Sequence, residues 1–323
     1  MQVVITGGAG FLGQRLARKL LERGTLADAS GAQRRIERIV LLDVVAATGF
    51  GDPRIEPVAA DITDPATLAR VIDRGTASVF HLAAVVSGQA ERDFDLGMRV
   101  NLDASRLLLD ACRAAGNKPR VLFTSSVAVY GGDLPAVVTD TTALCPRSSY
   151  GAQKAIGELL LADYTRKGFV DGRVARLPTI SVRPGRPNQA ASSFASGIIR
   201  EPLHGKAAVC PVGEQLRLWL SSPRRAIESL IALHDVAGDA MGPNRIVNLP
   251  GLSVSVAQMI AALRAVAGDD VVARIRFERD EAVERIVGSW PAAWDTSRAQ
   301  ALGLSADASF DAIVRAYIED DMR

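Results

Sequence analysis

Cysteine and histidine are scarce in this sequence. Three residues of each type occur among 323, and the cysteines, Cys112, Cys145 and Cys210, lie far apart along the chain. This spacing provides neither a disulfide framework nor the grouped ligands of a metal site. We therefore expect reduced, buried thiols without a catalytic role, Cys145 included, and no bound metal.

Long apolar segments and dense runs of one charge are missing as well. No run is long enough to span a bilayer, and the start, Met1-Gln2-Val3-Val4-Ile5, lacks the basic and apolar regions of a secretory leader. The net charge is +2, and no cluster of Lys and Arg offers a surface to nucleic acid. Hydrophobic residues make up 48% and charged residues 23%, which is typical of a globular enzyme. We expect a soluble cytoplasmic protein that binds neither membranes nor nucleic acid.

Apolar segments of strand length alternate with segments of helical periodicity through the first half of the chain. Strands are expected at 2–6, 39–42, 79–82, 121–123 and 174–177, with another ending at Asp61; helices are expected after Gly13, over 94–115 and from Ser149; a polar surface loop is expected over 25–36. Such alternation predicts an α/β fold with a Rossmann-type, doubly wound parallel sheet.

The pattern loosens after residue 177. Residues 178–224 are rich in Pro, Ser and Gly, with only short apolar runs. A helix near 225–237 and a strand at 246–249 return to the earlier style, and a helix near 254–266 and two further helical segments close the chain. We predict a Rossmann domain over 1–177, to which 225–250 return, and a smaller, discontinuous C-terminal substrate lobe built from 178–224 and 251–323.

A glycine-rich turn follows the first strand directly. Gly7, Gly10 and Gly13 would let a pyrophosphate approach the backbone and let the next helix approach the strand. A tight turn without a ligand is the alternative. The turn follows a strand, opens an amphipathic helix and lies at the N-terminus, and this is the context that a dinucleotide site requires.

Two acidic residues follow strands near this turn. Asp43 ends the second long strand, where a carboxylate can accept both ribose hydroxyls of an adenosine and would repel a 2′-phosphate. No Arg or Lys stands at 44–47, so the sequence favours NAD over NADP, although a loop cap is the alternative for Asp43. Asp61, with Ile62, could meet the adenine; a turn residue before Pro65 is an equally good interpretation.

The chemistry-bearing residues come next. Tyr150 and Lys154 are four apart, which places both side chains on one face of a helix. There the ammonium can lower the pKa of the phenol and make it a base. The fifth strand leads to Ser125 and Ser126, at the carboxyl end where open α/β sheets bind ligands. A serine there can hydrogen-bond a reacting oxygen; a solvated turn or helix cap is the alternative.

Together these motifs resemble the extended short-chain dehydrogenases/reductases, also called the NAD-dependent epimerase/dehydratase family. The resemblance covers nearly the whole chain and includes the segments His81-Leu82-Ala83-Ala84 and Asp295-Thr296-Ser297-Arg298-Ala299. It implies that Tyr150, as phenolate, takes a hydroxyl proton, that Lys154 holds the nicotinamide ribose, and that Ser126 orients the alcohol. The catalytic residues are then Ser126, Tyr150 and Lys154.

The resemblance also implies the remaining contacts and a partner. His81 and Asn101 are expected to be structural residues rather than catalysts. Helices near 94–115 and 149–166 often pair two chains in this family, which implies a homodimer. The cofactor is expected to be NAD, and its contacts are expected at Gly7, Gly10, Phe11, Leu12, Gly13, Asp43, Asp61, Ile62, Leu82, Ala83, Ala84, Asn101, Tyr150, Lys154, Pro178 and Ile180.

Sequence differences from other members of the family bear on the identity of the substrate. Thr179 stands where members that act on nucleotide sugars usually carry Asn. Residues 84–89, 177–185 and 192–199 resemble instead a branch that oxidises a four-carbon sugar acid, D-erythronate, at its 2-hydroxyl. Arg suits a bidentate clamp on a carboxylate, although each candidate Arg could instead form an ordinary ion pair. The residues expected to contact the sugar acid are Ser87, Ser126, Tyr150, Thr179, Arg183, Ser192 and Arg217, with Ser193 as a further hydroxyl.

Three functions remain open at this point. An NAD-dependent dehydrogenase of a small sugar acid is favoured. A nucleotide-sugar epimerase is the alternative enzyme, and a catalytically silent dinucleotide sensor is the alternative class. A sensor has no need of Ser126, Tyr150 and Lys154, which argues against it.

Overall fold

The computed structural model describes residues 1–185 and 190–322. Its main feature is a sheet of seven parallel strands in the order β12-β8-β7-β6-β1-β4-β5. The strands are β1 (Gln2–Thr6), β4 (Arg38–Asp43), β5 (Ile55–Ala59), β6 (Thr76–His81), β7 (Arg120–Ser126), β8 (Asp171–Leu177) and β12 (Ile246–Asn248). The order reverses at β1 and β6, so ligands are expected outside the carboxyl ends of these two strands. The predicted doubly wound sheet is confirmed.

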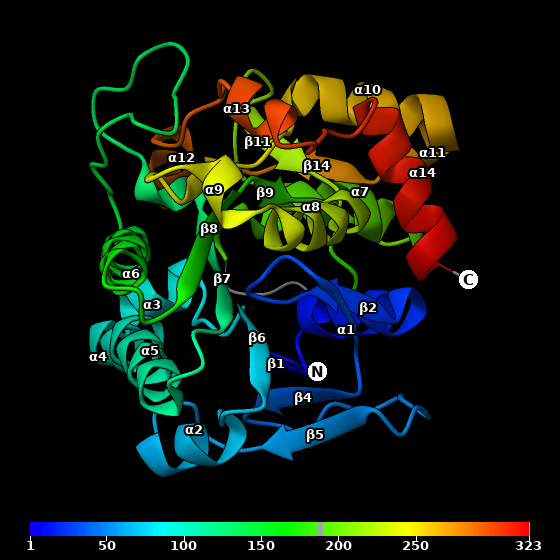
Figure 1. Cartoon of the computed structure of the whole chain (residues 1–323). Helices are drawn as coiled ribbons and strands as arrows, with labels where there is room; N and C mark the ends of the chain where they lie inside the picture. Colours follow the sequence, from blue (N-terminus) through cyan, green and yellow to red (C-terminus); the bar gives the residue numbers. More distant parts are fainter. Residues whose placement is uncertain (186–189, 323) are drawn as a thin grey trace.

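Helices cover both faces of this sheet (Figure 1). Alternate residues of β1 point to opposite faces, and both faces are apolar, which explains the continuous apolar run in the sequence. Val3 and Ile5 pack with residues of α1 and α8, whereas Val4 packs with residues of α2, α5 and α6. These helices are α1 (Phe11–Arg23), α8 (Pro223–Asp235), α2 (Pro65–Val71), α5 (Ala104–Ala115) and α6 (Ser149–Arg166).

A second hydrophobic core lies in the C-terminal part, and it joins residues from 182–220 with residues from 254–317. We interpret it as the core of the substrate lobe. Ala299 and Leu304 are exceptions within 251–323, because they pack into the core around β1. The elements of this part are β9 (Thr179–Ile180), α7 (Phe194–Leu203), β10 (Ala208–Cys210), β11 (Arg217–Ser221), β13 (Leu252–Ser255), α10 (Val256–Ala267), α11 (Asp269–Val272), β14 (Ile275–Phe277), α12 (Glu281–Gly288), α13 (Ser297–Ala301) and α14 (Phe310–Asp321). The short helix α9 (Gly238–Met241) packs instead into the core around β1 through Met241.

Several expectations differ from the structure. Cys112 and Cys210 are buried as expected, but Cys145 is exposed. Residues 25–36 form a hairpin of β2 (Thr25–Ala27) and β3 (Gln33–Arg35) rather than a loop. All of β3 is exposed, so no apolar alternation signals it. The loose segment 178–224 contains a helix and short strands, paired with residues distant in sequence; residues 186–189 of the predicted lobe lie outside the described residues. More elements follow residue 266 than the two expected helical segments.

The long helix expected over 94–115 is interrupted. It consists of α4 (Phe94–Gly97), a π-helical stretch (Met98–Asp103) and α5, and it follows α3 (Ser87–Arg92). A π-helical insertion often marks a functional site, and this one contains Asn101. None of the described helices is long and apolar enough to cross a membrane.

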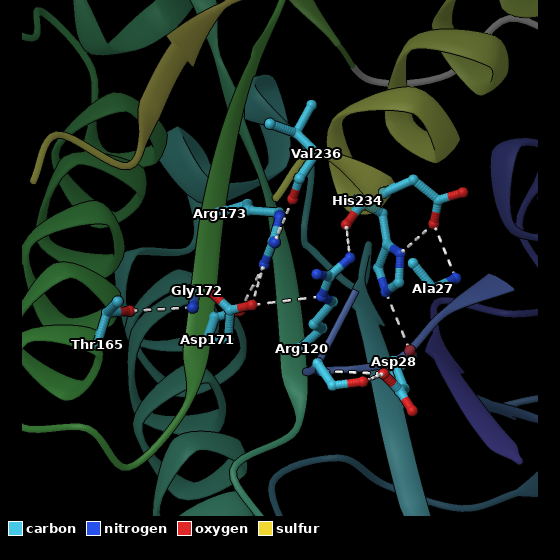
Figure 2. A network of polar contacts seen from close by, with 12 residues as sticks. Ala27, Asp28, Arg120, Thr165, Asp171, Gly172, Arg173, His234 and Val236 are labelled. Carbon is cyan, nitrogen blue, oxygen red and sulfur yellow. Dashed lines mark hydrogen bonds and ion pairs between the residues drawn. The ribbon is translucent and has the colours of Figure 1, made fainter. Parts of the chain in front are cut away.

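A buried ion network joins the amino-terminal ends of β7 and β8 to the end of α8 (Figure 2). Asp171 lies 3.3 Å from Arg120 and 3.0 Å from Arg173, and both guanidinium groups are buried. Arg120 donates to the carbonyl oxygen of His234 at 2.8 Å, and Arg173 donates to that of Val236 at 2.6 Å. The network lies at the amino ends of the strands, away from the ligand edge, so it serves the stability of the fold.

Candidate active site

The glycine turn after β1 is shaped by close backbone contacts. Gly7 has φ +71°, and a Cβ added at Gly13 would lie 2.2 Å from the Gly7 carbonyl oxygen. The helix therefore starts directly against the turn. No described side chain caps the first turn of α1, whose N-cap is Gly10, so the amides of Phe11 and Leu12 remain available to an anion. These residues fit the pyrophosphate of a dinucleotide.

Asp43 lies at the same edge and is joined to the turn. Its carboxylate accepts hydrogen bonds from the amides of Ala9 at 3.0 Å and Val44 at 2.8 Å. A carboxylate has further lone pairs, so Asp43 can still accept ribose hydroxyls. Asp61 is exposed and accepts the Thr63 amide at 2.8 Å, which is the turn role weighed against its adenine contact. Ile62, in contrast, is buried.

The loop of Leu82, Ala83 and Ala84 after β6 is held by buried side chains. His81 contacts Thr6 Oγ1 through Nδ1 at 2.7 Å and Ser105 Oγ through Nε2 at 2.9 Å. Thr6 Oγ1 in turn accepts the Ala83 amide at 3.2 Å. Burial lowers the pKa of His81 to about 3, so the ring stays neutral and acts as a bridge between neighbouring elements.

Asn101 connects this loop to α6. Its side chain accepts the Val85 amide at 2.8 Å and donates to the Val85 carbonyl at 3.1 Å and to Gln153 Oε1 at 2.8 Å. Three of its hydrogen-bonding positions are thus used within the protein. The geometry gives Asn101 a structural role, and a direct contact with the cofactor stays a prediction.

The N-terminus of α6 approaches the end of β7 very closely. A Cβ added at Gly151 would lie 2.0 Å from the Ala128 carbonyl oxygen, so only glycine fits there without a shift. This approach brings the phenol of Tyr150 into a hydrogen bond with Ser126. Ser126 Oγ also accepts the Ala128 amide at 3.1 Å, which orients the hydroxyl. One turn further along α6, the Lys154 ammonium lies 5.8 Å from the centre of the Tyr150 ring.

The electrostatics of this group differ from the simple expectation that the ammonium lowers the phenol's pKa. Burial raises the pKa of Tyr150 to about 12, opposed by the hydrogen bond to Ser126 and by the charge of Arg183. Burial also lowers the pKa of Lys154 to about 7, opposed by the carboxylate of Glu158. In the protein alone, Ser126 and Arg183 are therefore the groups that favour the phenolate.

A cavity of about 160 Å³ opens beside Tyr150 and Ser126. It collects most of the residues expected to bind the substrate or the nicotinamide. It also contains Trp290, which lies in a segment without any motif and was not predicted. The expected residues that line it are Phe11, Leu12, Ser87, Ser126, Tyr150, Pro178, Thr179, Ile180, Arg183 and Ser192.

Arg183 brings an unbalanced positive charge to this cavity. Its Nη2 atom is buried and has no hydrogen-bond partner among residues 1–185 and 190–322. Burial and the nearby charge of Arg200 lower the pKa of Arg183 to about 10. Arg200 itself is paired with Glu201 at 2.6 Å and donates to the Arg183 carbonyl oxygen at 2.7 Å. A buried cation of this kind is stabilised when an anion enters.

Arg217, the other candidate clamp, is not brought to the cavity. It is exposed and donates to the carbonyl oxygen of Ser253 at 2.8 Å. The strand pairing explains this position, because Leu220 rather than Arg217 lies beside Thr179. Three residues of strand correspond to about 10 Å, so Arg217 lies at the far end of β11.

A buried network behind the catalytic residues was also not predicted. Ser125 donates to Glu158, which is paired with Arg176 at 2.7 Å. Arg176 donates to the Tyr130 hydroxyl at 2.6 Å. Ser125 and Ser126 both line the cavity, but the Ser125 hydroxyl is committed to this network. The C-terminal motif at 295–299 also has a structural role. Its Arg298 donates a hydrogen bond to the Met241 carbonyl oxygen at 2.9 Å and so holds the segment before β12.

Several known proteins are similar to this chain in sequence and fold. Residues 3–224 match the NAD dependent epimerase/dehydratase family. D-erythronate dehydrogenase from Cupriavidus necator is 65% identical over 320 residues, which cover 99% of this chain and 98% of that protein. D-erythronate dehydrogenase from Haemophilus influenzae is 47% identical over the full length of both. A solved structure described as the nucleoside-diphosphate-sugar epimerase from Agrobacterium tumefaciens superposes with a TM-score of 0.93 at 44% identity, over 100% of this chain and 94% of that one. The resemblance inferred from the motifs is confirmed.

Proposed function

The chain belongs to the NAD-dependent epimerase/dehydratase family, and we propose that it oxidises the 2-hydroxyl of D-erythronate to give the 2-oxo acid. Its cofactor is NAD. The two full-length relatives that carry the name D-erythronate dehydrogenase support this substrate. The structural observation that carries the proposal is the Nη2 atom of Arg183, which is buried without a hydrogen-bond partner among the described residues, at a small cavity beside Tyr150.

Each residue of the site has a separate role in this reaction. The glycine turn and Asp43 hold the dinucleotide, and Lys154 holds its nicotinamide ribose. Tyr150, once ionised, takes the proton of the 2-hydroxyl while Ser126 donates a hydrogen bond to the same oxygen. When bound, NAD⁺ would supply the acceptor for the hydride that leaves C2 with its electron pair, so that C2 becomes a carbonyl carbon. Ser126 keeps its hydrogen bond to that oxygen, and Arg183 holds the adjacent carboxylate.

A nucleotide-sugar epimerase is the second candidate, because the Agrobacterium tumefaciens structure carries such a name. The volume of the cavity favours the small acid. About 160 Å³ is below the roughly 300–1,000 Å³ of sites that enclose drug-sized ligands. The two functions differ in their product. An epimerase returns the hydride to its sugar, whereas a dehydrogenase releases NADH, so NADH accumulates only with the dehydrogenase.

We expect D-erythronate with NAD⁺ to give NADH, and erythritol, which lacks the carboxylate, to be a poor substrate. An unpaired buried guanidinium costs about 1.5–3 kcal/mol, which corresponds to about a ten- to hundredfold loss in kcat/KM. Arg183→Met should cause a similar loss on the acid and leave NAD affinity within a few fold. The measurement is NADH absorbance in steady state.

Arg217→Met is the matched control, since Arg217 is an exposed arginine of the same lobe that contacts Ser253. It should behave like the wild type. If only nucleotide sugars react, the epimerase is the correct function. If Arg183→Met retains full activity on the acid, another residue holds the carboxylate.

We also propose that two copies of this chain pair through α4 and α6. Large apolar side chains gather on the solvent side of these neighbouring helices: Phe94 is 58% exposed, Ile156 41% and Leu159 66%. Ile156 and Leu159 are three residues apart on α6 and so share one face. Leu159→Glu should convert a dimer to a monomer in analytical ultracentrifugation, because it places charges at the centre of the interface. A wild-type monomer at micromolar concentration would contradict this pairing.

A further inference from the structure

Trp290 lines the active-site cavity but has no part in the chemistry derived above. Three aromatic side chains are among the described residues that line this cavity. Tyr150 is the base, and Phe11 belongs to the glycine turn of the cofactor site. Trp290 comes from the segment that follows α12, in the substrate lobe. Among the described aromatic residues that line the cavity, Trp290 is therefore the one to which neither cofactor binding nor proton transfer assigns a role.

Packing against neighbouring residues holds the side chain of Trp290 in place. It packs at once against the core of the substrate lobe and against the aromatic cluster of Trp219 and Trp294. The segment after it is paired to Val138, whose amide donates to the Ala293 carbonyl oxygen at 3.0 Å. Trp294 stacks on Trp219 with ring centres 5.8 Å apart. A side chain held on both sides in this way cannot move aside without disturbing packed residues.

The residues that line the cavity differ in the interactions they offer to a substrate. Arg183, Ser87, Thr179 and Ser192 offer charge and hydrogen bonds to a carboxylate and to hydroxyl groups. An indole offers a large apolar face and a single N–H donor. An acid with one more hydroxylated carbon would have to press that carbon against a packed wall. Its extra hydroxyl would lose water without a full set of partners, which is unfavourable.

We propose that Trp290 sets the chain length of the sugar acid by closing the cavity to acids longer than four carbons. This inference rests on the proposed function, since it needs a small sugar acid as the substrate. It makes Trp290 a specificity-determining residue that excludes substrates, which is a different role from that of Arg183. The wild type should accordingly discriminate between acids that share the same configuration at C2 and differ only in length.

The test is a series of four-, five- and six-carbon aldonic acids with NAD⁺, assayed with the wild type, Trp290→Ala and Trp290→Phe. One carbon more or less in a pocket changes specificity by about 10- to 200-fold. Trp290→Ala should therefore raise the ratio of kcat/KM for five- over four-carbon acids by about tenfold or more. Trp290→Phe, which keeps an aromatic ring in the same packing, should raise it less. NAD affinity and Tm are measured for each variant.

Trp294→Phe is the matched control, because Trp294 belongs to the same cluster but does not line the cavity. The ratio of kcat/KM for five- over four-carbon acids in this variant should equal that of the wild type. Ratios that stay at the wild-type value in both Trp290 variants overturn the inference while leaving the proposed function intact. A wild type that oxidises no acid of the series overturns the proposed function itself. If Trp290→Ala does not fold, Trp290→Phe and Trp290→Leu decide the question by the same ratio.

Discussion

Tyr150→Phe is expected to lower kcat/KM for the acid by about 10²–10⁴-fold, which is the usual contribution of a general base. The substitution removes only the hydroxyl that shares a hydrogen bond with Ser126, and the ring keeps its packing. NAD affinity should stay within a few fold, because we propose that the glycine turn, Asp43 and Lys154 hold the cofactor. Steady-state kinetics and a separate titration with NAD⁺ measure the two effects.

Tyr164→Phe is the control for Tyr150→Phe. Tyr164 lies near the other end of α6, where its hydroxyl donates to Asp110 at 2.6 Å. Its substitution should leave kcat/KM unchanged. If Tyr150→Phe turned over the acid at a rate close to the wild type, the proton would have another acceptor and the mechanism above would be wrong.

Asp171→Asn is expected to lower the free energy of unfolding by about 3–5 kcal/mol, the cost of removing one partner from a buried ion pair. Asp171 is the carboxylate shared by Arg120 and Arg173 (Figure 2). Both guanidinium groups are buried, and neither Nε atom has a hydrogen-bond partner in the described part of the chain, although that of Arg120 lies 3.3 Å from the Asp171 carboxylate. The neutral amide would leave two positive charges inside the protein. Urea denaturation measures the loss.

The comparison variant is Asp163→Asn, since Asp163 pairs with Arg166 at 2.6 Å on the surface of α6. An exposed pair contributes about 0–1 kcal/mol, so this variant should be close to the wild type in stability. The folded Asp171→Asn protein should keep its kcat/KM, because the network lies at the amino ends of the strands. A loss of stability no larger than that of Asp163→Asn would mean that Asp171 does not compensate the two arginines.

The local features of the site were predictable because each depends on residues close together in the sequence. The glycine turn, the carboxylate at the end of β4 and the four-residue spacing of Tyr150 and Lys154 are properties of single turns and of one helix. The same holds for the doubly wound sheet, since its strands are continuous apolar runs buried on both faces. The hairpin of β2 and β3 was missed because its second strand is wholly exposed and therefore carries no apolar pattern.

The choice between the two arginines could not be made from the sequence. Arg183 and Arg217 both lie near short strands, and both match what a carboxylate requires. The register of β11 on β9 places Arg217 at the far end of its strand, while the packing of α7 places Arg183 at the cavity. The sequence analysis expected Lys154 to lower the pKa of Tyr150, whereas burial raises it. The sequence could not show this, because the shift depends on how deeply the phenol is buried.

The sequence by itself determined the fold class, the glycine turn and the placement of Tyr150 and Lys154 on one face of a helix, since these follow from periodicity and from spacing within one element. Only the tertiary structure decided which distant residues come together: Arg183 beside Tyr150, Trp290 at the same cavity, and Asp171 between two buried arginines. These contacts arise where separate elements pack. Packing depends on register, burial and volume summed over the whole chain, and no short stretch of sequence contains that information.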